Sequence, residues 1–241
     1  MKIVLTGHLG FVGSSLKLYL ENKDHTVYGL DIKNNQDILT CDLPDCDTVI
    51  HLAALTGVLP SLLNPEEYWN TNVNGTRRVL SHYSNIRTLV ASSSSQYEPY
   101  LNPYAASKHT METIPHTNVC WMRFHTVYGP TVRKDMFLDK LQKGTLKYVT
   151  DHQRDFIHID DLCDAIDILL NNDYTGPVDI GTGITTKISS ICPTLPIVTD
   201  TPYERTSTCA DTKIMTELGF RPKHIFASSL STPLFQNQYR L

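Results

Sequence analysis

Three glycines, each three residues after the last, follow the first predicted strand and constrain the fold more than any other feature. Residues 2–6 are a short apolar run that predicts a β-strand, and residues 11–20 carry apolar side chains at helical spacing. Gly7, Gly10 and Gly13 lie at their junction. Glycine there allows a tight turn, close approach of a phosphate, and close packing of helix on strand. A plain glycine turn is the alternative, so the surrounding pattern must decide.

The same alternation of strand and helix continues along the chain. Short apolar runs predict strands at residues 26–30, 48–52 and 88–91, and apolar spacing predicts helices at residues 66–83, 137–146 and 160–170. Strands separated by helices require crossover connections, so we predict an α/β fold with a Rossmann-type doubly wound parallel sheet. The pattern weakens after Thr131. We expect residues 1–130 to form mainly the Rossmann core, and residues 131–241 mainly a small C-terminal subdomain with some segments returning to the core.

A carboxylate at the end of the second predicted strand indicates which ligand the glycine turn binds. Asp31 lies 18 residues beyond Gly13. A carboxylate there can accept hydrogen bonds from both ribose hydroxyls of NAD, whereas its charge would repel the 2′-phosphate of NADP. No arginine follows it, and Lys33 is the nearby cation. We therefore predict an NAD-binding core; the alternative is a solvated aspartate in a turn.

Composition excludes several other classes of protein. The 241 residues suffice for one domain with a small appendage, and their net charge of −4 gives no basic field for nucleic acid or a membrane surface. No apolar run approaches the roughly 20 residues that span a bilayer. The six cysteines show no Cys-x-x-Cys pair, and the histidines form no set with metal-ligand spacing. We expect a cytoplasmic protein with reduced thiols, no bound metal, and no nucleic-acid or membrane partner.

A tyrosine followed four residues later by a lysine occurs twice in the chain. On a helix this spacing places the ammonium one turn from the phenol, where it favours the phenolate and so a base near neutral pH. Tyr19 and Lys23 close the helix after the glycine turn, far from the expected nicotinamide. Tyr104 and Lys108 follow the strand at residues 88–91 and its serine run. We therefore predict the second pair to be catalytic.

The order of these motifs resembles extended short-chain dehydrogenase/reductases of the NAD-dependent sugar-nucleotide epimerase/dehydratase family. The similar segments are residues 6–13, 31, 42–43, 51–54, 72–76, 92–97, 102–108, 154–161 and 217–222. Residues 123–130 (RFHTVYGP) and 133–136 (RKDM) resemble the UDP-glucuronate 4-epimerase branch in particular. Two positions depart from that branch: His125 replaces an aromatic residue and Lys134 replaces a proline.

The resemblance implies NAD-dependent epimerisation at C4 of a nucleotide sugar, with UDP-glucuronate to UDP-galacturonate as the preferred reaction. Tyr104 would remove the 4-hydroxyl proton while hydride leaves C4, and hydride would return to the opposite face of the 4-keto sugar. Ser94 and Ser95 stand where related dehydratases and decarboxylases have acidic residues, which favours epimerisation. The alternatives are another UDP-sugar 4-epimerase (UDP-glucose or UDP-N-acetylglucosamine), a 4-keto-sugar nucleotide reductase, and a non-catalytic dinucleotide-binding regulator.

The resemblance also assigns site residues. Those implied in catalysis are Tyr104, Lys108 and Ser93. Those implied in NAD binding are Gly7, Gly10, Phe11, Val12, Gly13, Asp31, Asp42, Leu43, Leu52, Ala53, Ala54, Asn72, Tyr104 and Lys108. Those implied in binding the nucleotide sugar, within a small substrate-binding subdomain, are Ser92, Ser93, Ser94, Thr126, Arg133, Arg154 and Arg221. Arg133 would hold the substrate carboxylate, and Arg154 and Arg221 the diphosphate, for which a guanidinium is well shaped. The alternative is a surface arginine for Arg133 and structural salt bridges for the other two.

Several segments are shorter than in the family. Between Asp31 and Asp42 there is room for little beyond a turn and a strand, and Ser93 lies only 11 residues before Tyr104. Pro115 should end the catalytic helix early. Relatives often dimerise through that helix and the one before it, so a homodimer and a monomer both stay open. His51 is expected to pack beside the cofactor rather than react.

Overall fold

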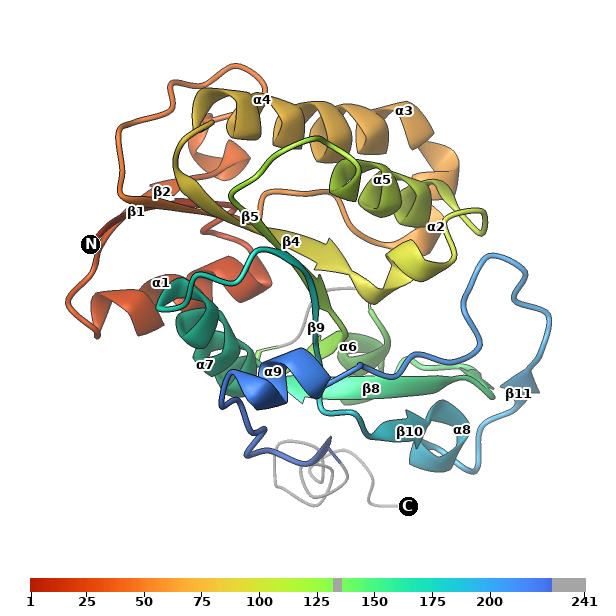
Figure 1. The fold of residues 1–241 in the computed structure, drawn as a ribbon. Coiled ribbons are helices and arrows are strands. Elements are labelled where there is room, and N and C mark those ends of the chain that lie inside the picture. Colours follow the sequence, from red (N-terminus) through yellow and green to blue (C-terminus); the bar gives the residue numbers. More distant parts are fainter. Residues whose placement is uncertain (132–135, 227–241) are drawn as a thin grey trace.

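A six-stranded parallel sheet forms the centre of the computed structural model, which describes residues 1–131 and 136–226 (Figure 1). Its strand order is β2-β1-β3-β4-β5-β9, and all of its strand pairs are parallel. The strands are β1 (Lys2–Thr6), β2 (Thr26–Leu30), β3 (Thr48–His51), β4 (Arg87–Ser93), β5 (Val119–Phe124) and β9 (Gly176–Ile180). The predicted α/β fold with a Rossmann-type sheet is confirmed.

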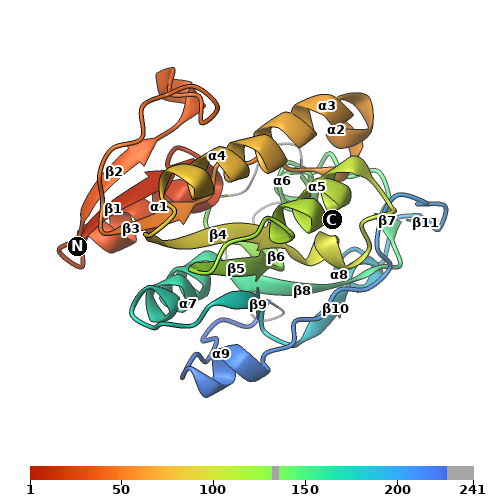
Figure 2. The same ribbon diagram turned by 45° about the horizontal axis from the view of Figure 1, so that its top comes forward.

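Helices cover both faces of this sheet, as Figure 1 and Figure 2 show. Helices α1 (Phe11–Glu21) and α7 (Ile159–Leu170) lie on one face, and α2 (Val58–Leu63), α3 (Pro65–Tyr68), α4 (Gly75–His82) and α5 (Pro103–Glu112) lie on the other. Alternate strand residues point to opposite faces. Ile3 and Leu5 therefore pack in the core with α1 and α7, whereas Val4 packs with Val79 of α4. Burial on both faces explains why the strands read as continuous apolar runs.

The long helix predicted at residues 66–83 is divided into three pieces. Helix α3 leads into a π-helical segment (Trp69–Asn74), which leads into α4. A π-helical turn contains one more residue than an α-helical turn, and such segments occur often at functional sites. Apolar spacing alone cannot show this extra residue.

The segment between β2 and β3 contains a 3₁₀ turn (Ile32–Asn34) and no strand, so β2 lies at the edge of the sheet. Two of its carbonyl groups, those of Ile38 and Cys41, accept hydrogen bonds from the Arg78 guanidinium at 2.8 and 2.6 Å. A side chain of α4 thus satisfies backbone groups that a further strand would otherwise pair. The short spacing from Asp31 to Asp42 is occupied by this compact loop.

The second half of the chain adds two small sheets and a separate core. One sheet has the order β10-β8-β6, and the other pairs β11 with β7. Their strands are β6 (Thr126–Tyr128), β7 (Val149–Thr150), β8 (Gln153–His158), β10 (Thr185–Lys187) and β11 (Ile197–Val198). Short helices α6 (Phe137–Gln142), α8 (Ile188–Ile191) and α9 (Lys213–Glu217) accompany them. Helix α6 ends before residue 146 because Gly144 adopts the left-handed conformation.

Strand β9 is part of the large sheet and helix α7 packs against it, although both lie in the second half of the sequence. The domain division at residue 130 stays a prediction. The six cysteines all lie in the described residues, and none forms a disulfide. Within residues 1–131 and 136–226, no helix has the length and apolar character needed to cross a membrane.

Candidate active site

The glycine turn lies at the carboxyl ends of β1 and β3. Gly7 has a φ of +73°, and a Cβ added to it would lie 2.8 Å from the backbone nitrogen of Ala53. A Cβ on Gly13 would lie 2.1 Å from the carbonyl oxygen of Gly7. These two positions therefore require glycine for a turn that packs directly on the segment after β3. The structure thus brings Leu52 and Ala53 to the same edge of the sheet as the turn.

The N-terminus of α1 is open at this edge. Gly10 is its N-cap residue, and among the described residues no side chain caps the first turn. The N–H groups at the start of an α-helix have no partner within the helix, and together with the helix dipole they favour an anion. Phe11, Val12 and Gly13 supply these groups, so the turn fits a dinucleotide pyrophosphate.

Asp31 anchors the glycine turn from the end of β2. Its Oδ2 accepts a hydrogen bond from the backbone of Leu9 at 2.9 Å, and its Oδ1 accepts one from the backbone of Lys33 at 3.0 Å. Each carboxylate oxygen has a second lone pair, so the group can still accept bonds from ribose hydroxyls. The Lys33 ammonium donates to the carbonyl of Leu9 at 2.7 Å. That cation is thus engaged by the turn, and the arrangement fits NAD better than NADP.

Asn72 lies in the π-helical segment and connects two parts of the site. Its Oδ1 accepts from the backbone N–H of Leu55 at 2.8 Å, and its Nδ2 donates to the Leu55 carbonyl at 3.0 Å and to Ser107 Oγ at 2.9 Å. The side chain is completely buried. Asn72 therefore holds the chain after β3 against α5, a positioning contact that the family resemblance did not reveal.

The predicted catalytic pair lies on α5, and its lysine is buried. The side chain of Lys108 is 2% exposed, and its ammonium donates to the carbonyl oxygen of Ala91 in β4 at 2.7 Å. Burial lowers the pKa of Lys108 to about 7, and the nearby Glu112 carboxylate opposes this effect. Tyr104 lies one helical turn earlier, and its ring packs edge-on against Tyr68 at 6.2 Å between centroids. The helix ends at Glu112, before Pro115, as predicted.

The serine run spans the end of β4 and the start of a 3₁₀ turn (Ser94–Tyr97) that packs against α5. The Ser92 hydroxyl donates to Glu112 at the end of α5. Ser93 accepts the backbone N–H of Ser95 at 3.1 Å, so its own proton stays available for another acceptor. The carbonyl of Ser94 accepts from Arg205 at 2.6 Å. The Ser93 hydroxyl can therefore donate to a sugar oxygen, whereas the Ser92 hydroxyl is already engaged by Glu112.

A partly buried polar network behind the serine run was not predicted. The Arg123 guanidinium binds both carboxylate oxygens of Glu112 and also donates to the Tyr97 hydroxyl at 2.9 Å. That hydroxyl donates to Asp179 at 2.8 Å. The network joins α5 to three strand ends. The four-residue spacing of Tyr104, Lys108 and Glu112 along one helical face is the sequence signal that indicates Glu112.

His51 is neutral and structural. Its Nδ1 lies 2.7 Å from the hydroxyl of Thr6, and its Nε2 lies 3.1 Å from that of Thr76. Complete burial, with a smaller effect of Lys108, lowers its pKa to about 3. Its packing at the end of β3 agrees with the expectation that it does not react.

Other predicted residues have local partners. Arg154 donates to the carbonyl of Gln153 at 2.9 Å and lies 3.4 Å from Glu204. Arg221 donates to two carbonyls near the end of α9, those of Thr216 and Phe220. These contacts show no anion-binding geometry, so the diphosphate roles of both arginines stay predictions.

Asp42 is exposed, Leu43 is buried in the core beside α4, and Ala54 and Thr126 are half-buried. Arg133, the predicted ligand of the substrate carboxylate, lies outside the described residues.

The other tyrosine–lysine pair has a different setting. The Tyr19 hydroxyl donates to Asp164 and the Lys23 ammonium to Asp167, and these bonds connect α1 to α7.

Comparison with known proteins identifies similar sequences and folds. A model of the NAD dependent epimerase/dehydratase family matches residues 3–181. Protein CapI of Staphylococcus aureus is 32% identical over 231 residues, which cover 70% of this chain and 69% of CapI. The UDP-glucuronate 4-epimerase of Thermodesulfobacterium geofontis is 31% identical over 173 residues, with 59% of this chain and 54% of that protein covered. A Bacillus cereus UDP-glucuronic acid 4-epimerase structure, in complex with UDP-glucuronic acid and NAD, is 26% identical, with 97% of this chain and 98% of that chain covered and a TM-score of 0.81.

Proposed function

Because the chain belongs to the NAD dependent epimerase/dehydratase family, we propose that it inverts C4 of a UDP-linked sugar and that this sugar is glucuronate. The observation that carries the proposal is the buried Lys108 ammonium, held by Ala91 one helical turn from Tyr104. A buried lysine in this setting has a cost in stability that a purely structural role does not explain. The non-catalytic alternative is disfavoured for the same reason.

The residues present fit NAD. The uncapped start of α1 suits the pyrophosphate, and Asp31 at the end of β2 suits the adenosine ribose. When bound, NAD supplies the hydride acceptor and then the hydride donor for the sugar C4. The reaction has no net oxidation, so the proposed enzyme needs no external reductant. A reductase would need one, and Asp31 disfavours the NADPH that many such enzymes use.

The chemistry assigned to this chain is a proton transfer at the sugar 4-hydroxyl. Tyr104 removes this proton as phenolate and returns it after the sugar has turned over. The Lys108 ammonium stabilises the phenolate across one turn of α5. Ser93 donates a hydrogen bond to the same sugar oxygen and orients it. Ser94 and Ser95 place no acid beside the 4-keto sugar, which favours return of hydride over elimination.

The choice of glucuronate is supported by two observations. Residues 123–130 and 133–136 resemble the UDP-glucuronate 4-epimerase branch, and relatives of that name are among the similar proteins. We assign Arg133 to the substrate carboxylate, which it would hold so that the 4-keto acid does not lose CO₂. Substrate binding would then depend on this arginine, whereas the stability of the fold would not. A homodimer and a cytoplasmic location stay predictions.

The test is incubation of purified protein with UDP-glucuronate, UDP-glucose and UDP-N-acetylglucosamine, followed by NMR of the products. UDP-galacturonate should form without added reductant. Tyr104→Phe should abolish turnover and keep NAD binding, whereas the matched control Tyr19→Phe, in the other tyrosine–lysine pair, should stay active. Arg133→Ala should slow UDP-glucuronate far more than UDP-glucose. Failure to convert any UDP-sugar would refute the epimerase proposal, and preference for another sugar would refute only the substrate.

A further inference from the structure

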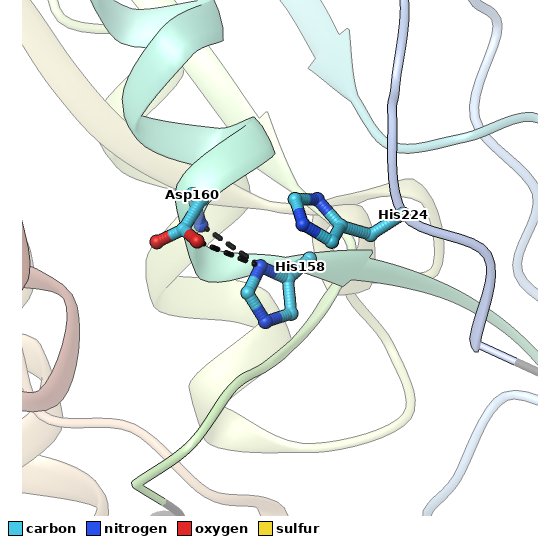
Figure 3. Close-up of side chains that lie close together, drawn as sticks. All are labelled: His158, Asp160 and His224. Carbon is cyan, nitrogen blue, oxygen red and sulfur yellow. Dashed lines mark hydrogen bonds and ion pairs between the residues drawn. The ribbon is translucent and has the colours of Figure 1, made fainter. Parts of the chain in front are cut away.

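Two histidines that the proposed reaction does not use lie in contact beyond the end of β8, with an aspartate beside them (Figure 3). His158 ends β8, and His224 comes from the segment after α9. Their ring centroids are 4.1 Å apart with an angle of 27° between the planes. The Asp160 carboxylate lies 3.5 Å from Nδ1 of His158. One ligand atom from each residue lies within 4.8 Å of the other two.

We propose that His158, Asp160 and His224 bind one divalent transition-metal ion of the zinc type. Two imidazoles and one carboxylate are the donors that zinc accepts, whereas calcium and magnesium prefer oxygen ligands alone. With zinc–ligand bonds of about 2.0–2.1 Å, tetrahedral ligand atoms lie roughly 3.3 Å apart. His158 Nδ1 and Asp160 Oδ2, 3.5 Å apart, nearly have this separation, and the Nδ1 lone pair that accepts the backbone N–H of Asp160 at 3.3 Å would turn to the ion. Rotation of the exposed side chains of Asp160 and His224 would close the remaining distance, and water would complete the tetrahedron.

A second carboxylate holds His224 in the orientation that metal binding requires. Asp161 Oδ1 lies 3.0 Å from Nδ1 of His224, and its Oδ2 accepts the backbone N–H groups of Lys223 and His224 at 3.0 and 2.9 Å. A carboxylate on one imidazole nitrogen keeps the proton there and leaves the lone pair of the other nitrogen for a metal. Asp161 is buried, so both the backbone and the ring of His224 are fixed.

Access and charge also suit a metal ion. The side chains of Asp160 and His224 are 70% and 39% exposed, so an ion reaches them from solvent. The Asp160 carboxylate gives the cluster the negative charge that attracts a cation. The edge-on contact between His158 and Tyr128, at 5.0 Å between centroids, supports the ring from its inner side.

Sequence spacing could not reveal this cluster, because 66 residues separate the two histidines and β8 and α9 must first fold. No metal was expected from the spacing of histidines along the chain, and the folded cluster departs from that expectation. A bound ion would join the start of α7 to the segment after α9. The proposal does not depend on the epimerase activity.

The experiment is calorimetric titration of zinc chloride into untagged protein from which metal has been removed by a chelator. We expect one equivalent to bind. His224→Gln and Asp160→Asn should each weaken binding by at least the roughly 10–100-fold that follows loss of a residue which only orients a metal ligand. His82→Gln, which changes an exposed histidine on α4, should bind as the parent does. Circular dichroism checks that each variant is folded.

Absence of zinc binding by the parent protein would overturn the proposal. So would binding that persists unchanged in His224→Gln, because the ion would then be held elsewhere, for example by the exposed Cys209. Unchanged binding in Asp160→Asn alone would overturn the assignment of the carboxylate as a ligand.

Discussion

Replacement of Lys108 by methionine is expected to stabilise the fold and abolish activity. Methionine has a similar length and no charge, so it removes the buried ammonium while it keeps most of the packing. The proposed catalytic role would be lost with the charge. A gain in stability with a loss of function is typical of a residue that an active site requires and the fold does not.

The magnitude follows from the change in pKa. The pKa of Lys108 falls from 10.5 to about 7 on burial. At about 1.4 kcal/mol for each pH unit between these values, the buried ammonium destabilises the fold by about 5 kcal/mol below pH 7. The hydrogen bond to Ala91, which methionine cannot make, offsets roughly 1.5–3 kcal/mol of this. Lys108→Met should therefore be more stable than the parent by about 2–3.5 kcal/mol at pH 6.5.

The sign of the pH dependence follows from proton binding. Between pH 7 and 10.5 the unfolded chain keeps a proton on Lys108 that the folded protein has released, so the parent becomes more stable as pH rises. The advantage of the methionine variant should therefore shrink with pH and approach zero near pH 10. Lys23→Met is the matched control, because Lys23 is exposed and its ion pair with Asp167 raises its pKa.

The assay is urea unfolding of NAD-free protein at pH 6.5, 8 and 9.5, followed by tryptophan fluorescence. The free energy of unfolding is compared between parent and variant at each pH. A variant less stable than the parent at pH 6.5, or a difference that does not change with pH, would refute the reasoning.

Three further changes test other parts of the site. Gly13→Ala places a Cβ against the Gly7 carbonyl; it should lower the free energy of unfolding by about 1–3 kcal/mol and weaken NADH binding in a fluorescence titration, and an unaltered affinity would contradict the tight turn. Asp31→Asn removes the charge that repels a 2′-phosphate, so the ratio of NAD to NADP affinity should fall at least about tenfold; titration with both nucleotides measures it, and a constant ratio would count against the ribose contact. Glu112→Gln removes the charge paired with Arg123 and should destabilise the fold by about 3 kcal/mol in urea; a change below about 1 kcal/mol would show that the ion pair is dispensable.

Local patterns predicted the sheet well. The strands at residues 2–6 and 26–30 agree with β1 and β2, because strands buried on both faces are short apolar runs that a sequence displays directly. The glycine turn was also predictable, because its backbone geometry requires glycine and the sequence therefore shows it directly. Features that depend on residues distant in the sequence were not predictable. The loop after β2 takes its form from Arg78, and the sequence gives no indication that this guanidinium binds the carbonyls of Ile38 and Cys41.

The candidate site divides in the same way. Tyr104 and Lys108 follow from helical spacing and position, whereas the polar network of Glu112, Arg123 and Tyr97 depends on three elements meeting after folding. For the arginines, the resemblance predicted diphosphate contacts, which stay predictions, and it gave no indication that Arg221 donates to a carbonyl of α9. Long polar side chains reach many partners, so sequence position constrains them least.

Because of the π-helical segment at Trp69–Asn74, the exact number of residues in this helix determines where both its site residue and its core residues point. Each residue of an α-helix turns the chain by about 100°. Deleting one residue, such as Thr71, would let the segment become a regular α-helix, and either Asn72 or the core residues Val79 and Leu80 would rotate out of place. The same length of helix with one residue fewer could keep its hydrophobic packing or its bonds to Leu55 and Ser107, but not both. Insertions and deletions in this helix should therefore be tolerated less than substitutions on its exposed face.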